Sequence, residues 1–149
     1  MEIEFKLKGL DEWLKKIAAL QGLEHDPRLN KALGQGTELM KGAVRDLTPV
    51  DTGNLRNKIS SINVRLMEWV VETNVEYASY VEFGTGKLGD PKVPHTSKDS
   101  WTYYSEKMQQ FITTHGQPPA HMFTMGFSTT YKKAVELVRV KAMEIIKNA

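Results

Sequence analysis

An aspartate–threonine–glycine triplet, Asp51-Thr52-Gly53, is the first feature of this sequence that could do chemistry. The triplet occurs in aspartic proteases, where two carboxylates share a proton, and a dimeric enzyme takes the second copy from its partner. Such triplets lie between strands of an all-β chain, whereas this one follows a predicted helix. An Asp followed two residues later by Gly is also typical of a β-turn, in which the Asp side chain accepts hydrogen bonds from backbone N–H groups. The turn is the preferred interpretation, and a dimeric aspartic protease using Asp51 is the alternative.

The histidines do not have the spacing of a metal site. His25, His95, His115 and His121 all fall in predicted loops or at the ends of elements. No two are four apart on a predicted helix, and there is no HExxH motif. His115 and His121 are six apart across a Gly-Pro-Pro segment that could bring them together, but we expect surface histidines without a metal.

Two carboxylates, Glu76 and Glu82, flank the segment YASYV. Acid–base catalysis would require burial to raise one pKa. In the simpler interpretation one of them faces water and the other caps a neighbouring turn. No G-x-S-x-G motif is present, and GTGKLG lacks the spacing of a phosphate-binding loop. The sequence therefore predicts no catalytic residue and no cofactor.

Basic and aromatic residues alternate in one further segment, which contains Lys98, Trp101, Tyr103, Tyr104 and Lys107. Stacking and phosphate contacts there could bind nucleic acid. Two carboxylates in the same segment dilute its positive charge. A packing or subunit-contact role is favoured, because Tyr and Trp are enriched at interfaces.

Length and composition predict an intracellularly made, soluble protein with a single domain over residues 1–149. The chain has 149 residues, a formal charge of +2 and no cysteine, so disulfides and thiolate metal sites are excluded. The charge is too small to indicate nucleic-acid binding by itself. No apolar run approaches the roughly 20 residues of a membrane span, and Met1 is followed by charge rather than by a signal peptide.

The first third of the chain predicts one strand and two helices. Alternation over residues 1–8 predicts a half-buried strand, and helical periodicity follows over residues 10–22. A second helix is predicted over residues 26–47, with Asp26 as N-cap and Pro49 beyond its end. Its apolar stripe should consist of Leu29, Leu33, Leu39, Met40, Ala43, Val44 and Leu47. The helix also contains Gly34, Gly36 and Gly42. Each glycine costs about 1 kcal/mol relative to alanine, which indicates close packing or a bend.

The rest of the chain predicts two hairpins and a long helix. Residues 61–66 and 69–75 alternate as a β-hairpin, with Ile62, Val64 and Leu66 on one face. A long loop should follow from residue 76 to residue 100. A second hairpin is favoured over a short helix in the next segment, because its two ends, Trp101–Tyr104 and Phe111–Thr114, are rich in aromatic and β-branched residues. The final helix is expected from about Met122 to Asn148, with an apolar stripe of Tyr131, Ala134, Val135, Val138, Ala142, Ile145 and Ile146.

The predicted fold class is α+β. A small antiparallel sheet, built from the N-terminal strand and the hairpins, should pack against two N-terminal helices and one long C-terminal helix. The segment at about 84–117 should form a loop or hairpin insertion within the single domain.

Three segments together resemble the tailed-phage neck family described as gene-product-ten-like. TPVDTGNLRNKIS is similar to its T-P-V-D-T-G-x-L-R-x-S-I signature, NVEYASYVEFGTG to N-x-x-Y-A-x-Y-V-E-F-G-T, and GQPPAHMFTMGF to G-x-P-A-x-P-F-x-x-x-A-F. Their order and spacing match from about Lys31 to Lys147. The departures are Lys58 for a frequent Ser, Gly126 for a common Ala, and Pro119-Ala120-His121-Met122 for the usual Pro-Ala-Arg-Pro. The region from residue 87 to residue 115 varies greatly in length within the family.

The resemblance gives the matched positions a structural role. They are Asp51, Thr52, Gly53, Leu55, Tyr77, Ala78, Tyr80, Val81, Glu82, Phe83, Gly84 and Pro118. We expect Gly53 and Gly84 to permit positive φ, and Tyr77, Tyr80 and Phe83 to fill a seam between sheet and helix.

The function that the resemblance implies is that of a structural virion protein without catalytic residues. It would join or complete the tail at the head–tail interface of a phage or prophage-derived particle, as a ring, typically a hexamer, that can be monomeric when isolated. Its partners would be a connector or head-closure protein and a tail-terminator or tail-tube protein, with no membrane and no specific nucleic acid. A tail terminator that caps tube polymerisation is the alternative. It would be made in the bacterial cytoplasm and end in the virion.

The predicted contact surface is the loop from Phe83 to Gln117. The candidate interface residues in it are Lys87, Lys98, Trp101, Tyr103, Tyr104 and Phe111.

Overall fold

A computed structural model describes residues 22–148, and it confirms the α+β class. The predicted strand over residues 1–8 and all but the last residue of the helix predicted over residues 10–22 lie outside this range. The helices are η1 (Leu23–His25), α2 (Pro27–Leu47), α3 (Asn54–Asn57), α4 (Ala78–Phe83), η2 (Gly86–Leu88) and α5 (Met122–Lys147). The strands are β1 (Ile59–Arg65), β2 (Glu68–Thr73), β3 (Trp101–Ser105) and β4 (Gln110–Thr114). None of the helices within residues 22–148 is long and apolar enough to span a membrane.

Helix α2 begins and ends as its sequence predicts. The side chain of Asp26 accepts a hydrogen bond from the backbone N–H of Arg28 at 2.8 Å, and Pro27 is the first helical residue. The Arg28 guanidinium also binds this carboxylate, which holds the pKa of Asp26 below its ordinary value. At the other end, Thr48 is the C-cap, and its hydroxyl donates to the carbonyl of Val44 at 2.6 Å. The predicted bounds of this helix are confirmed.

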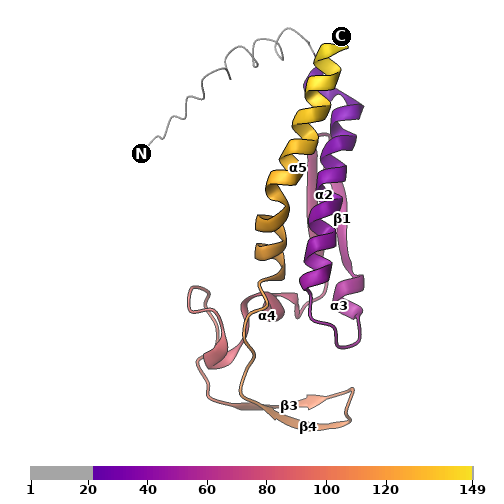
Figure 1. The fold of residues 1–149 in the computed structure, drawn as a ribbon. Coiled ribbons are helices and arrows are strands. Elements are labelled where there is room, and N and C mark those ends of the chain that lie inside the picture. Colours follow the sequence, from indigo (N-terminus) through magenta and orange to yellow (C-terminus); the bar gives the residue numbers. More distant parts are fainter. Residues whose placement is uncertain (1–21, 149) are drawn as a thin grey trace.

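The long helices α2 and α5 run antiparallel, side by side (Figure 1). Small residues let their backbones approach closely. A Cβ on Gly36 would lie 3.0 Å from the Cβ of Ala134, and a Cβ on Gly126 would lie 3.0 Å from the backbone nitrogen of Val44. Nearer the other end of the pair, Leu29 packs with Ala142 and Ile145. Close packing, one of the two explanations for the helix glycines, is confirmed at Gly36.

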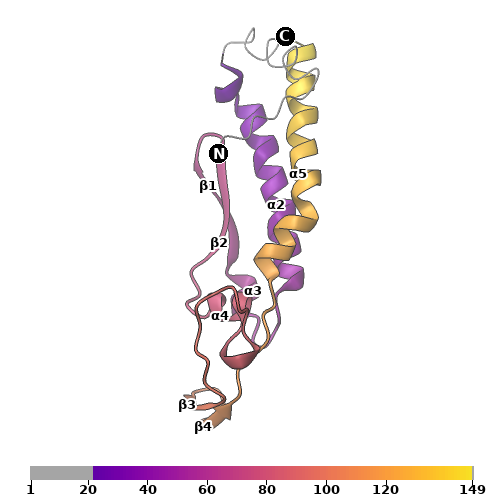
Figure 2. The same cartoon turned by 90° about the vertical axis from the view of Figure 1, so that its left-hand side faces the viewer.

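The predicted apolar stripe of α2 is wrong in part. Leu39 and Leu47 are exposed, while Ala32 and Thr37 are buried. The physical reason is that α2 lies between α5 and the β1–β2 hairpin, so it has neighbours on two sides (Figure 2). Small side chains fit both contacts, and two of the leucines are left on the free side. The α5 stripe is likewise split: Ala134, Ala142 and Ile145 are buried, whereas Tyr131 and Val135 are exposed.

The β1–β2 hairpin packs against α2 through its Trp69 side. A Cβ on Gly34 would lie 2.7 Å from the Trp69 ring, so this glycine makes room for the indole. Asn30 accepts hydrogen bonds from the Trp69 indole N–H at 3.1 Å and from the Met67 backbone N–H at 2.9 Å, which fixes the turn. The predicted face with Ile62 on it points away from the helix. Its members Ile62, Val64 and Leu66 are exposed.

The second predicted hairpin is also confirmed: β3 pairs with β4 in antiparallel register, with Tyr104 opposite Phe111. It lies across the end of the helix pair, far from β1 and β2 (Figures 1 and 2). In residues 22–148 the two hairpins are therefore separate two-stranded sheets rather than parts of one sheet. The loop predicted from residue 76 contains the short helix α4, which the sequence analysis missed.

Two glycines of α2 give a matched test of the helix contact. A Cβ added at Gly42 would have no atom within 4 Å, whereas a Cβ added at Gly36 would meet Ala134. Gly42→Ala should therefore raise the free energy of unfolding by up to about 1 kcal/mol through helix propensity. Gly36→Ala should gain none of this, because α2 and α5 must move apart. Urea denaturation measures both, and equal stabilisation by the two changes would contradict the close approach.

Candidate functional site

The first motif forms a corner between α2 and β1. Gly53 has a φ of 81°, so the positive φ expected there is confirmed, and the helix α3 follows directly. The Thr52 hydroxyl accepts a hydrogen bond from the Asn54 N–H at 3.3 Å, and Leu55 is buried in the core. The carboxylate of Asp51 takes a different role from the one expected of it. It forms an ion pair with Lys107 of the distant hairpin and is 78% exposed.

The second motif supplies a buried carboxylate that caps α5. Glu82 is 5% exposed, and its oxygens accept hydrogen bonds from the backbone N–H groups of Phe123 at 2.8 Å and Thr124 at 3.0 Å. The Thr124 hydroxyl donates to the same carboxylate at 2.6 Å. A negative charge at these positions is favourable because the first N–H groups of a helix lack partners and carry the positive end of its dipole. Of the two expected carboxylates, Glu82 is therefore the cap and Glu76 is exposed.

The end of α4 and the start of the third motif are held together by the backbone. Thr85 and Gln117 form an isolated β-bridge, with N–H to carbonyl distances of 2.9 and 3.2 Å. Gly84 has a φ of 73°, as expected, and a Cβ there would lie 2.6 Å from the carbonyl oxygen of Gln117. Glycine is required at this position on both grounds. The chain therefore leaves the body and returns to it at one point.

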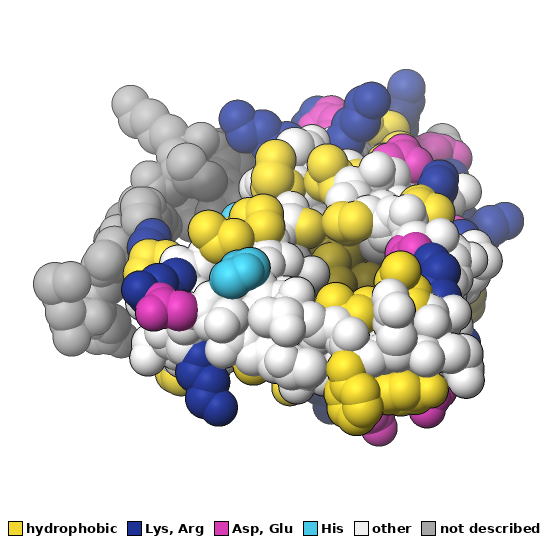
Figure 3. All heavy atoms as spheres, turned by 90° about the horizontal axis from the view of Figure 1, so that it is seen from below, with side chains coloured by type: hydrophobic (Ala, Val, Ile, Leu, Met, Phe, Trp, Pro, Cys, Tyr) yellow, Lys and Arg dark blue, Asp and Glu magenta, His cyan; other side chains and the backbone are white. Residues whose placement is uncertain are grey.

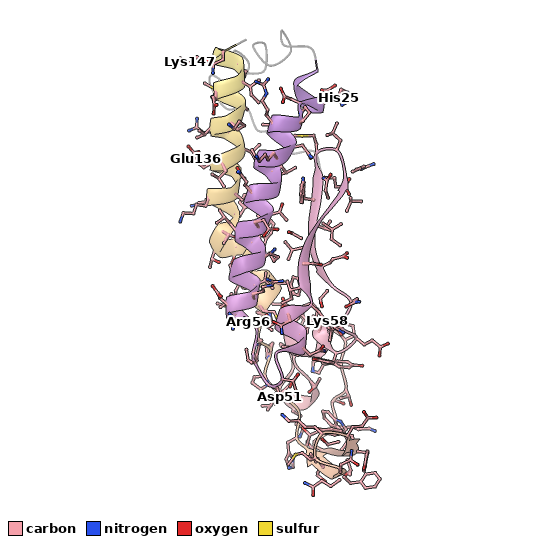
Figure 4. All side chains as sticks on the ribbon, turned by 90° about the vertical axis from the view of Figure 1, so that its right-hand side faces the viewer. His25, Asp51, Arg56, Lys58, Glu136 and Lys147 are labelled. Atoms are coloured by element: carbon pink, nitrogen blue, oxygen red, sulfur yellow. The ribbon has the colours of Figure 1, made fainter. Side chains whose placement is uncertain are left out.

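All three motifs meet at one cleft of about 280 Å³. It is lined by Pro49, Val50, Asp51, Thr52, Gly53, Asn54, Leu55, Tyr77, Val81, Gln117, Pro118 and Ala120. The side-chain amide of Asn54 donates to the Tyr77 hydroxyl at 3.2 Å and thereby links the first motif to the second. In Figure 4, Asp51 lies at the end of the molecule that carries the β3–β4 hairpin. Segments up to about 70 residues apart in sequence thus form one surface.

This cleft contains few ionisable side chains. Among its lining residues, Asp51 carries the one carboxylate, and that carboxylate is paired with Lys107. A protease dyad needs two carboxylates that share a proton. The cleft of a single chain therefore does not form such a dyad.

The histidines lie apart and each has its own contact. The Nδ1 atom of His95 lies 2.6 Å from the Val93 carbonyl, and that of His115 lies 3.2 Å from the Asp99 carbonyl. His121 lies 3.7 Å from Asp90. Within the described part of the chain, no group of three or more potential metal ligands comes together.

The residues of the predicted contact surface lie on or beside the β3–β4 hairpin. Lys87 forms an ion pair with Asp99. Tyr103, Tyr104 and Phe111 are exposed. Trp101 lines a second pocket, of about 480 Å³, together with residues of α4. Their role in contacts between proteins remains a prediction.

One expectation about the second motif is wrong. Tyr77 and Tyr80 do not fill a seam between sheet and helix, since both are exposed, Tyr80 to 60%. Because α4 is only six residues long, it buries one face, on which Ala78 and Glu82 lie. Tyr80 and Phe83 instead line the second pocket. The sequence analysis also missed Gln117, whose side-chain amide donates to the Tyr80 carbonyl at 2.9 Å.

The described residues form a small α+β protein in which the three motifs meet at one cleft. A family model described as "Bacteriophage HK97-gp10, putative tail-component" matches residues 11–84. Over these residues the chain matches the HK97-gp10-like family, which confirms the resemblance seen in its motifs. The range includes the first motif and most of the second. No curated protein and no solved structure matches the chain. The family match supports a structural role for the chain in a phage.

The Glu82 cap can be tested with a matched pair of variants. Glu82→Gln keeps the side-chain size but replaces an acceptor by an N–H₂ donor beside helix N–H groups. We expect it to lower the free energy of unfolding by about 2–3 kcal/mol, since a charged acceptor is lost and a buried donor is left unpaired. Glu76→Gln, at the exposed carboxylate, should change it by less than about 0.5 kcal/mol. Urea denaturation followed by circular dichroism compares the two, and similar values would contradict the capping role.

Proposed function

We propose that the chain joins or completes the tail at the head–tail interface of a tailed phage or prophage-derived particle, as a ring. The observation that carries the proposal is the match to a phage tail component combined with the arrangement of the insertion. The β3–β4 hairpin projects crosswise from one end of the helix pair (Figure 1). It presents exposed aromatic side chains, which are enriched where proteins meet.

The partners follow from this proposal. Copies of the chain meet around the ring, a connector or head-closure protein lies on one side, and a tail-terminator or tail-tube protein on the other. The particle is assembled in the bacterial cytoplasm, and the chain remains in the virion. The proposal gives it no catalytic role, no cofactor and no specific nucleic acid. The alternating basic and aromatic residues suit a protein contact, because the charge of Lys107, one of the two lysines in that segment, is already balanced by Asp51.

Particles made without this chain distinguish joining from termination. If the chain joins or completes the tail, its absence should leave filled heads beside unattached tails of normal length. If it is a terminator, tube polymerisation should continue and give overlong tails. Electron microscopy of lysates from a host carrying the phage with an early stop codon in this gene measures both, with the gene supplied in trans as control. Normal, infectious particles would contradict both roles.

The role of the insertion can be tested by removing it. A Cβ on Gly86 would lie 3.3 Å from the Cα of Gly116, so the two ends of the insertion are already adjacent. We expect replacement of residues 88–114 by a short glycine linker to leave the helical circular dichroism of the remaining chain and its cooperative unfolding intact. It should abolish ring formation and fail to complement the gene. Normal assembly by the shortened protein would refute the contact role of the insertion.

A further inference from the structure

We propose that the aromatic tip of the β3–β4 hairpin of one copy docks into the pocket beside α4 of the next copy. The tip consists of Tyr104 and Phe111. The α4 pocket is the one lined by Ser79, Tyr80, Phe83, Gly84, Thr85, Val93, Pro94, His95, Thr96 and Trp101. This inference rests on the proposed ring and names the contact that would build it.

The tip is an exposed and ordered pair of rings. Phe111 is 75% exposed, more than any other large hydrophobic residue among residues 22–148. Its ring meets that of Tyr104 edge to face, with centroids 5.3 Å apart. Such a pair keeps its shape before binding, so little side-chain freedom is lost on docking.

The pocket has the size and lining for such a tip. Its volume is about 480 Å³, within the roughly 300–1,000 Å³ of typical ligand pockets and large enough for an aromatic side chain. Rings of Tyr80, Phe83 and Trp101 line it, and Val93 and Pro94 add apolar surface. Figure 3 shows the end of the molecule that carries the β3–β4 hairpin, with hydrophobic side chains gathered around a hollow on this face.

The tip cannot enter the pocket of its own chain. Side chains alternate between the faces of a strand, so Trp101 and Tyr104, three residues apart on β3, point to opposite faces. Phe111 is the cross-strand partner of Tyr104 and shares its face. Trp101 lines the pocket, which means that the tip rings point away from it. They also lie about 10 Å further along the strand. The occupant must therefore be another molecule.

Charge favours a second copy as that occupant. Glu106 lies in the hairpin turn next to the tip, while Lys92 and Lys98 flank the residues that line the pocket. Within the described range, none of these three has an ion-pair partner in the chain. Docking would bring an acidic tip to a basic rim, and such complementarity fixes orientation.

This contact would be heterologous, since the tip and the pocket are different surfaces of the same chain. Contacts of this kind repeat head to tail, and they close into a ring when the rotation between neighbours permits it. The geometry of the contact therefore agrees with the proposed ring.

Engineered cysteines test the contact directly, because the natural chain has none. Thr113→Cys, beside Phe111 on the same face of β4, and Ser79→Cys variants of the full chain are purified separately, mixed over a wide concentration range and oxidised. A disulfide-linked two-chain species should form in the mixture and exceed by at least tenfold that formed by either variant alone. Thr113→Cys mixed with Ser128→Cys, on exposed α5 surface, is the matched control. Equal yields in the two mixtures, or no cross-link at any concentration, would overturn the proposal.

A second measurement uses self-association without cross-linking. Phe111→Ala should weaken it at least tenfold in sedimentation velocity, while Thr113→Ala, on the same face of β4, should leave it unchanged. Unaltered association of Phe111→Ala would overturn the contact, as would a wild-type chain that is monomeric throughout.

Failure of the proposed function is distinguishable from failure of the contact, since it would appear as normal particles without the gene while the cross-link still forms. A required gene together with normal assembly by Phe111→Ala would leave the function standing and remove the contact.

Discussion

The buried carboxylate of Glu82 is the interaction on which the architecture depends. It lies on α4, yet the N–H groups that it binds are the first ones of α5, about 40 residues further along the chain. His121, the residue that precedes α5, has a φ of 47° and makes no side-chain cap of its own. The helix therefore takes its cap from another element, and its start is fixed relative to α4. Everything between them, including the hairpin, is a closed loop whose two ends are held by this carboxylate and by the Thr85–Gln117 bridge.

A second constraint comes from the helix pair. Small residues on α2 and α5 bring the two backbones close, and α2 receives the β1–β2 hairpin on its other side. The body is thus thin, and many large hydrophobic side chains remain exposed on α5 and β1. Surface of this kind is typical of a protein that completes its packing in an assembly rather than alone.

The sequence predicted the elements better than their faces. The Asp26 cap, the end of α2 before Pro49, both hairpins and the last helix followed from local signals, since each depends on a few neighbouring residues. The stripe of α2 was partly wrong because periodicity does not reveal that a helix has two neighbours. The short helix α4 was missed because a helix of six residues is too short to show a helical period in its apolar residues. The Glu82 cap was anticipated only as one of two interpretations, since its partners are distant in sequence.

The Thr85–Gln117 bridge has an evolutionary consequence. It joins the two ends of the insertion, so that we expect the residues between them to contribute little to the folding of the helices and of β1–β2. Changes in the length or composition of the insertion should therefore alter the stability of the body little, whereas the same changes within the body should lower it. The chain therefore consists of a body fixed by its internal contacts and an insertion whose length and composition are free to change. Exchanging the insertion for a segment of another length would therefore require no redesign of the body.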